Sequence, residues 1–219
     1  MQYNKKNLLK NRKDAAQKLK EIIPMNRLKE EDWDVIAVSK YGLDLASYLC
    51  ENFPNKIDFL FSQPIYAPNN HECEVARVSE TEEIVINESL MEAFDIQYDY
   101  IYGEAHRKHE EVILPDIYQK RKGRHFACME QRTVLLIDDG TETGTKFMTA
   151  LKSILIQKPK AVYIAVPVIP SDVLEVLETF VDQIFFLYDI GDYVETTHYY
   201  EELEDVSDEK IEKILEERK

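Results

Sequence analysis

The chain has 219 residues, of which 44% are hydrophobic, enough for the core of one domain. Its formal net charge of -15 argues against a nucleic-acid-binding protein, because phosphate contacts need a basic surface. The three cysteines are odd in number and widely spaced, which argues against a disulfide framework and a thiolate zinc site and fits a reducing cytosol. No stretch is long and apolar enough to span a bilayer, and the charged first residues do not resemble a signal peptide, so we expect a cytoplasmic protein without membrane contact.

The first half of the chain predicts helices and strands in alternation. Ala15 and Leu19 lie on one face of an amphipathic helix, which Pro24 ends. Val35 begins a short unbroken apolar run, which is typical of a parallel strand buried on both faces. The expected elements are, in order, a helix over residues 5–23, a strand over 35–38, a helix over 43–53 and a strand over 57–61.

The middle of the chain is less regular. Residues 62–82 contain two prolines, two asparagines and scattered charges, and they predict a long irregular excursion. A short strand over residues 84–86 and a charged, mostly helical region over 88–114 follow. Residues 115–132 are basic and poorly patterned.

From residue 133 onward the pattern becomes regular. The expected elements are a strand over residues 133–137, a loop over 138–145, a helix over 146–156, a strand over 161–166, a helix over 171–180 and a strand over 183–187. Strands that alternate with helices predict βαβ units, and therefore an α/β protein with a parallel sheet. Ligands of such sheets bind beyond the carboxyl ends of the strands, where the loop over 138–145 lies.

This loop carries the clearest functional signal, and it reads Asp138-Asp139-Gly140-Thr141-Glu142-Thr143-Gly144-Thr145-Lys146. Backbone N–H groups at a helix N-terminus, together with threonine hydroxyls, make an anion site suited to phosphate. The two glycines allow the backbone to turn and to approach a ligand closely. Adjacent carboxylates accept hydrogen bonds from vicinal hydroxyls or ligate Mg²⁺. A ribose 5-phosphate presents both kinds of group.

Other phosphate-binding and acidic motifs do not fit this loop. A Walker A loop needs wider glycine spacing than that of Gly140 and Gly144, and a Ser or Thr after the lysine, which Lys146 lacks. A Rossmann fingerprint and a response-regulator acidic pocket would both follow the first strand. An ordinary strand-to-helix turn, capped by Asp139 or Thr141, would not explain so many small and polar residues together.

The apolar strand, the acidic pair and the Thr-Gly step resemble the phosphoribosyl pyrophosphate (PRPP) signature of type I phosphoribosyltransferases. The resemblance extends over most of the chain, and the nearest relatives are bacterial phosphoribosyltransferases of undefined acceptor. It implies one domain over residues 1–219, a three-layer parallel sheet flanked by helices, with a small hood or flap. Residues 1–30 and 189–219 would form terminal helical or hood segments, and residues from about 100 to 130 a mobile flap.

The resemblance also implies a mechanism. PRPP bound with Mg²⁺ loses pyrophosphate at C1 of the ribose, and a nitrogen nucleophile attacks that carbon. By position, Asp138 and Asp139 would hold the ribose hydroxyls and the Mg²⁺ ion. Thr141, Thr143, Gly144 and Thr145 would cradle the 5-phosphate. The substrate-binding residues would also include Gly140, Glu142 and Lys146. Glu142 would exchange a proton with the nucleophile, or be an ordinary solvated carboxylate.

A second segment resembles the family's pyrophosphate-binding loop, and it comprises Ser39, Lys40, Tyr41 and Gly42. Lys40 would neutralise pyrophosphate, or be a solvated lysine at a strand end. Tyr41 stands where the relatives carry glycine, and Lys146 follows the Thr-Gly-Thr run where they carry small or hydroxyl residues. The resemblance implies a nucleobase phosphoribosyltransferase of nucleotide metabolism. The two departures favour an alternative, a PRPP- or nucleotide-binding regulatory protein with weak or no catalysis.

Other features leave alternatives open. Residues 1–30 carry nine Lys or Arg against three Asp or Glu, whereas residues 189–219 carry four against twelve. These are either two solvated helix faces or a contact between the two termini, within one subunit or between subunits of the homodimer that we expect. His106 and His109 have the spacing of zinc ligands but no evident third ligand. Tyrosines near the C-terminus predict helix packing or a hood over the acceptor, and they are Tyr193, Tyr199 and Tyr200.

Overall fold

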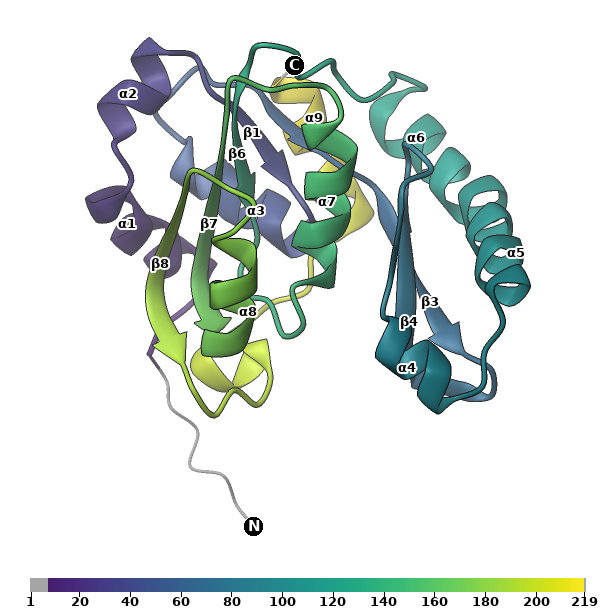
Figure 1. The fold of residues 1–219 in the computed structure, drawn as a ribbon. Coiled ribbons are helices and arrows are strands. Elements are labelled where there is room, and N and C mark those ends of the chain that lie inside the picture. Colours follow the sequence, from purple (N-terminus) through teal and green to yellow (C-terminus); the bar gives the residue numbers. More distant parts are fainter. Residues whose placement is uncertain (1–7, 219) are drawn as a thin grey trace.

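The computed structural model describes residues 8–218, which form two sheets with their covering helices (Figure 1). The larger sheet has five parallel strands in the order β2-β1-β6-β7-β8. Its strands are β1 (Asp34–Ala37), β2 (Ile57–Phe59), β6 (Thr133–Ile137), β7 (Ala161–Pro170) and β8 (Gln183–Ile190). The expected α/β class and parallel sheet are therefore confirmed.

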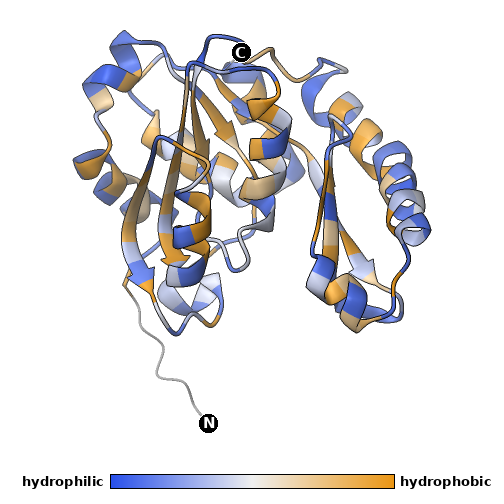
Figure 2. Ribbon diagram, viewed as in Figure 1, coloured by the Kyte–Doolittle hydropathy of each residue, from blue (hydrophilic) through white to orange (hydrophobic). Residues whose placement is uncertain are grey.

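Helices cover both faces of this sheet, because its strands present apolar side chains to both sides. In β6 all five residues are buried. Leu135 and Ile137 pack into one core and Leu136 packs into the other, as the two-residue period of a strand requires. The first core is covered by α1 (Arg12–Ile22), α2 (Met25–Glu30), α3 (Lys40–Leu49) and α9 (Asp208–Glu217), and the second by α7 (Thr145–Leu155) and α8 (Ser171–Leu177). Figure 2 shows the apolar strands enclosed between helices whose outer faces are hydrophilic.

The smaller sheet is antiparallel, in the order β3-β4-β5, and stands beside the larger one (Figure 1). Its strands are β3 (Ser62–Ala67), β4 (Asn70–Ser79) and β5 (Ile84–Ile86). The prediction of an irregular excursion over residues 62–82 was therefore wrong. Pro64 is tolerated because β3 is an edge strand, and shifts in the pairing beside Tyr66 disturb the alternation that marks a strand.

Helices α4 (Glu88–Ala93), α5 (Tyr98–Lys108) and α6 (Leu114–Arg121) and the π-helix over His109–Ile113 follow the small sheet. The helical prediction for residues 88–114 is confirmed, and the basic stretch after it begins within α6. Lys120 lies 2.8 Å from Asp116 and 3.2 Å from Asp208. Figure 1 places α6 near the top, whereas β7 and β8 end at the bottom. The basic stretch therefore lies away from the acidic loop, and a mobile flap there stays a prediction.

The two terminal segments lie against one another within one chain. The backbone N–H groups of Leu8 and Leu9 donate to the carbonyl of Tyr199, and Glu201 N–H donates to the carbonyl of Leu9. Arg12 Nη1 also donates to the carbonyl oxygen of Glu204, 2.6 Å away. The contact between the termini is therefore made by backbone groups and by one basic side chain, that of Arg12. Residues 1–7 of the basic segment lie outside the described part of the chain. Within residues 8–218, no helix has the length and apolar character that crossing a membrane requires.

Candidate functional site

The acidic loop joins the end of β6 to the start of α7 and is closed by its own side chains. Gly144 N–H donates to Thr141 Oγ1 at 3.1 Å, and Thr145 N–H donates to Thr143 Oγ1 at 3.4 Å. Gly144 adopts a φ of 71°, and a Cβ there would lie 2.8 Å from Val173 Cγ1. Both the conformation and the lack of space require glycine.

The loop offers backbone donors to a ligand. Within residues 8–218, the N–H groups of four consecutive residues donate to no other group, and these residues are Gly140, Thr141, Glu142 and Thr143. They precede the N-terminus of α7, a helix of 11 residues. Unpaired N–H groups and the positive end of a helix dipole together suit a phosphate group.

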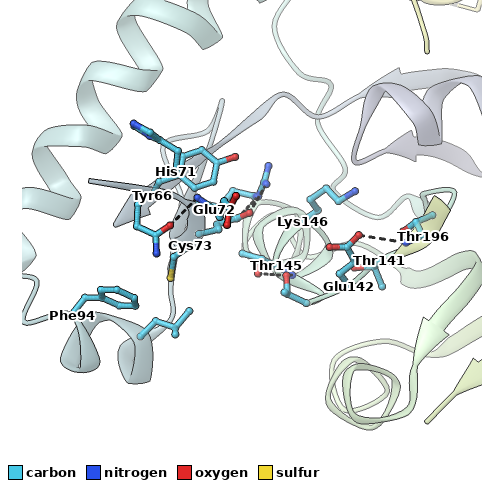
Figure 3. A pocket seen from close by; sticks show the side chains of 16 residues that line it. Tyr66, His71, Glu72, Cys73, Phe94, Thr141, Glu142, Thr145, Lys146 and Thr196 are labelled. Atoms are coloured by element: carbon cyan, nitrogen blue, oxygen red, sulfur yellow. Dashed lines mark hydrogen bonds and ion pairs between the residues drawn. The ribbon is translucent and has the colours of Figure 1, made fainter. Parts of the chain in front are cut away.

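These residues line a cavity of about 690 Å³ between the acidic loop and the small sheet, a volume suited to a small-molecule ligand. The loop side includes Glu142, Lys146 and Thr196. The side facing it comes from β3, β4 and α4, and it comprises Tyr66, Asn70, His71, Glu72, Cys73, Glu74, Arg77, Leu90 and Phe94. Figure 3 shows Tyr66, His71, Glu72, Cys73 and Phe94 across the cavity from Glu142 and Lys146.

A second cavity, of about 310 Å³, shares Glu142, Lys146 and Thr196 with the first. It extends toward Asp139 and Tyr41 and is closed by the C-terminal segment from Leu203 to Asp205. Lys146 and Glu142 thus line both cavities, of which one extends to Asp139 and the other to the small sheet.

Asp138 is fully buried at the end of β6 and has partners for both carboxylate oxygens. Oδ1 accepts hydrogen bonds from the Ser39 hydroxyl and, at 3.0 Å, from Asp139 N–H. Oδ2 lies 2.5 Å from Lys146 Nζ. Burial alone would lower the pKa of Lys146, but the Asp138 carboxylate outweighs it and raises that pKa. Lys146 is therefore a permanent cation beside the loop.

Asp139 is 3% exposed and pairs with a residue of the first helix. Its Oδ2 accepts a hydrogen bond from Arg12 Nε at 2.8 Å, and its carbonyl accepts one from the Tyr200 hydroxyl at 2.6 Å. Burial first, and then the neighbouring Asp138 carboxylate, raises the pKa of Asp139 to about 7, although Arg12 opposes the shift. The guanidinium of Arg12 also stacks 4.6 Å from the centre of the Tyr41 ring, which fixes its position.

The acidic pair does not fit a directly coordinated Mg²⁺ ion. Mg²⁺ requires a near-octahedral shell of oxygen atoms, whereas Lys146 and Arg12 already place cations against both carboxylates. Among residues 8–218, no group of three or more His, Cys, Asp or Glu side chains could hold a metal ion, and His106 and His109 form no zinc site. The predicted metal role of Asp138 and Asp139 is therefore not supported by their surroundings.

The segment predicted as a pyrophosphate loop is the first turn of α3, which is a correction to its expected conformation. It is helical because Ser39 caps it, with its Oγ accepting a hydrogen bond from Gly42 N–H at 3.0 Å. Gly42 packs under the acidic loop, where a Cβ would lie 2.9 Å from Asp138 Cα. Tyr41 lines the second cavity, but Lys40 Nζ lies 2.6 Å from Asp205. The Tyr41 hydroxyl also donates to Asp205 Oδ1, at 3.2 Å. The structure thus brings Ser39 and Gly42 to the acidic loop and ties Lys40 and Tyr41 to the C-terminal segment.

Glu142 is exposed at the boundary of the two cavities and accepts a hydrogen bond from Thr196 N–H at 3.4 Å. Gly140 lies directly beneath the Thr196 side chain and has no room for a Cβ. Tyr199 and Tyr200 are each 1% exposed, so they serve packing and not a hood over an acceptor.

The sequence did not identify several residues of the site. Arg12 lay in a recognised helix, but nothing in the local pattern shows that it reaches Asp139, 127 residues away. Arg77 and Glu74 face the cavity as a bidentate pair at 2.8 and 3.0 Å. The only signal for that pair would have been the alternation of β4, which was not recognised as a strand.

No family model matches the sequence. Among solved structures, the crystal structure of TT1426 from Thermus thermophilus is 26% identical and superposes with a TM-score of 0.77, covering 96% of this chain and 98% of that one. Two further structures are more distant. A hypothetical protein from Neisseria gonorrhoeae with bound ppGpp is 12% identical, with a TM-score of 0.48 over 98% of each chain. A hypoxanthine-guanine phosphoribosyltransferase from Bacillus anthracis str. 'Ames Ancestor' is 12% identical, with a TM-score of 0.44, covering 87% of this chain and 86% of that one. Likeness at that level concerns the fold alone. With its parallel five-stranded sheet, flanking helices and small antiparallel sheet, the chain has an α/β fold that it shares with TT1426 over nearly its whole length.

Proposed function

We propose that the chain is a phosphoribosyltransferase, which moves phosphoribose from PRPP to a nitrogen nucleophile, a nucleobase, and releases pyrophosphate. One observation carries this proposal. The unpaired N–H groups of the acidic loop lie at the first cavity, Asp139 lies at the second, and Lys146, which holds the buried Asp138, lines both. A ribose 5-phosphate needs an anion cradle and hydroxyl acceptors, and these residues include both kinds of group.

In this proposal the 5-phosphate binds the loop from Gly140 to Thr145, at the N-terminus of α7. The ribose hydroxyls donate to the carboxylate of Asp139, which lines the second cavity, and Lys146, held by Asp138, adds positive charge beside it. Mg²⁺ would accompany the substrate pyrophosphate as its counter-ion, because the acidic pair already has cationic partners.

The acceptor enters from the side of the small sheet. Phe94 is 45% exposed and lies at the cavity with Leu90 and Tyr66, which gives a flat heterocycle apolar and aromatic surface to contact. Glu142, in the acidic loop, lines this cavity and the second one, which contains Asp139. It accepts or donates the proton of the attacking nitrogen. Pyrophosphate leaves through the second cavity, beside Tyr41.

The test is pyrophosphate release from PRPP in the presence of Mg²⁺ with each of a panel of purine and pyrimidine bases. We expect turnover with at least one base, and a loss of at least about tenfold in kcat/KM for Asp138→Asn, since it removes a charge-assisted hydrogen bond. Asp99→Asn, on the exposed side of α5, is the matched control and should keep full activity. The predicted homodimer can be measured by sedimentation equilibrium on the same samples.

A regulatory protein that binds PRPP or a nucleotide is the second candidate, and it is favoured by a specific observation. Both acidic residues are ion-paired, and Lys40, expected to meet pyrophosphate, is paired with Asp205. This candidate predicts thermal stabilisation by PRPP without pyrophosphate release. No stabilisation and no turnover with any base would contradict both candidates.

A further inference from the structure

We infer that Lys146 is a built-in counter-ion of Asp138, which allows the acidic loop to bind a ribose 5-phosphate group without a divalent cation held by the chain. The inference rests on the proposed function, since it takes ribose 5-phosphate as the ligand of the loop. It goes beyond that function because it assigns the charge balance of the site to two side chains of this chain.

The first argument is the charge count around the acidic pair. Asp138 and Asp139 are 0% and 3% exposed, so each ionised carboxylate needs a nearby positive charge. Lys146 Nζ lies 2.5 Å from Asp138, and Arg12 Nε lies 2.8 Å from Asp139. Arg12 Nη1 also lies 3.6 Å from the buried Asp44, which has its own cation in Lys210, 2.6 Å away. With all three carboxylates ionised, three cations match them, and the acidic pair leaves no negative charge for a metal ion to neutralise.

The second argument is the occupancy of the carboxylate oxygens. Asp138 Oδ1 accepts from Ser39 and from Asp139 N–H, and Oδ2 faces the ammonium. Asp139 Oδ2 accepts from Arg12, which leaves Asp139 Oδ1 without a partner among residues 8–218. One oxygen does not make a Mg²⁺ site, and a divalent ion beside the ammonium would be repelled.

The third argument is that Lys146 can reach a ligand while it holds Asp138. Its side chain is 27% exposed and lines both cavities. Figure 3 shows it extending along the side of the cavity that holds Glu142 and Thr196. An ammonium has three N–H donors, and the ion pair with Asp138 Oδ2 needs no more than one of them. The others can donate to oxygen atoms of the ribose or the phosphate, which is the bridging role that a divalent cation would otherwise have.

The experiment measures binding of ribose 5-phosphate to the full chain by isothermal titration calorimetry, in EDTA and in saturating MgCl₂. Ribose 5-phosphate is the probe because it lacks the pyrophosphate that makes PRPP itself a strong ligand of Mg²⁺. For the unaltered chain, we expect the dissociation constants in the two buffers to agree within about threefold, a small free-energy difference.

Two variants test the residue. Lys146→Met keeps the length of the side chain and removes the charge, so binding in EDTA should weaken at least about tenfold, and MgCl₂ should restore part of the loss. Lys152→Met is the matched control, since Lys152 lies further along α7, is 52% exposed and pairs with Glu83 at 3.4 Å. It should bind as the unaltered chain does, in both buffers. Circular dichroism establishes that each variant is folded.

Three outcomes would overturn the inference. The first is that the unaltered chain binds ribose 5-phosphate only in MgCl₂, which would contradict the inference but not the proposed function. The second is that Lys146→Met and the unaltered chain bind ribose 5-phosphate equally well in EDTA. Absence of binding in both buffers would remove the proposed ligand and therefore the inference. The comparison of the unaltered chain in EDTA and in MgCl₂ needs no variant. It therefore tests whether binding requires Mg²⁺ even if Lys146→Met does not fold.

Discussion

Two clusters of buried charge differ in what they leave accessible. The acidic-loop cluster comprises Asp138, Asp139, Arg12 and Lys146. The junction cluster lies between the two sheets and comprises Asp58, Glu80, Arg121 and Arg124. Each holds two acids and two bases, with one enclosed cation, Arg12 or Arg121. The second cation is partly exposed in both, at 27% for Lys146 and 36% for Arg124, but the exposed part of Lys146 lines two cavities.

This difference shows how one chemistry serves two purposes. Buried ion pairs contribute little net stability, because the loss of hydration offsets the attraction. In the junction cluster the enclosed Arg121 pairs with both Asp58 and Glu80, which fixes the small sheet against the large one, and it stacks 5.0 Å from the Phe61 ring centre. In the acidic-loop cluster the partly exposed cation, Lys146, lines two cavities and stays within reach of a ligand. The position of Lys146 at the cavities, and not the count of charges, distinguishes the acidic-loop cluster.

The largest expected effect is the loss of a cation from the junction cluster. Arg121→Met leaves the buried Glu80 carboxylate without its partner, and we expect a loss of about 3–5 kcal/mol in the free energy of unfolding. Urea denaturation followed by circular dichroism measures it. Since burial already raises the pKa of Glu80, the double variant with Glu80→Gln should recover much of the loss. No recovery would mean that packing, and not charge, accounts for the effect.

The next effect is a pH dependence that belongs to the acidic-loop cluster. Burial raises the pKa of Asp139 from 3.8 to about 7. Between these two pH values the folded chain therefore keeps a proton on the Asp139 carboxyl group that the unfolded chain has released. Asp139 therefore stabilises the fold at low pH, and this contribution is lost as the pH rises to about 7. Melting temperatures between about pH 5 and 8 should show this decline, and Asp139→Asn should flatten it. An unchanged slope in that variant would assign the titration to another group.

A smaller effect tests the contact that holds the acidic-loop cluster in place. Gly42→Ala would put a Cβ 2.9 Å from Asp138 Cα, and we expect a loss of about 1–3 kcal/mol in stability together with weaker ribose 5-phosphate binding. Gly103→Ala, on α5 with nothing within 4 Å of the added carbon, is the control. It should gain up to about 1 kcal/mol from helix propensity. Equal stabilities for the two variants would contradict the close approach.

The smallest effect concerns the rim of the acidic-loop cluster. The Lys40–Asp205 pair is exposed, so Asp205→Asn should leave the melting temperature nearly unchanged. It frees Lys40, and the KM for PRPP should fall if Lys40 then meets the pyrophosphate. A KM that rises would show that the Asp205 pairing helps to form the site.

Regular local patterns explain what could be predicted of the fold. Residues 133–190 alternate apolar strands with amphipathic helices, and the structure has β6, α7, β7, α8 and β8 there. The hairpin of β3 and β4 was missed, because an edge-strand proline and two shifts in the pairing break the two-residue alternation. The acidic loop was recognised because its glycines, threonines and aspartates are adjacent in the chain.

The sequence by itself determined the parallel sheet and the place of the loop at its carboxyl edge, since both depend on periodicity and spacing within a few residues. Only the tertiary structure decided the state of that loop. Arg12 reaches Asp139 across 127 residues, and Ser39 reaches Asp138 across 99. Such pairings depend on which helix packs against which strand, and no local pattern encodes them. The charge of the site, and therefore its need for a metal, is set by those long-range contacts.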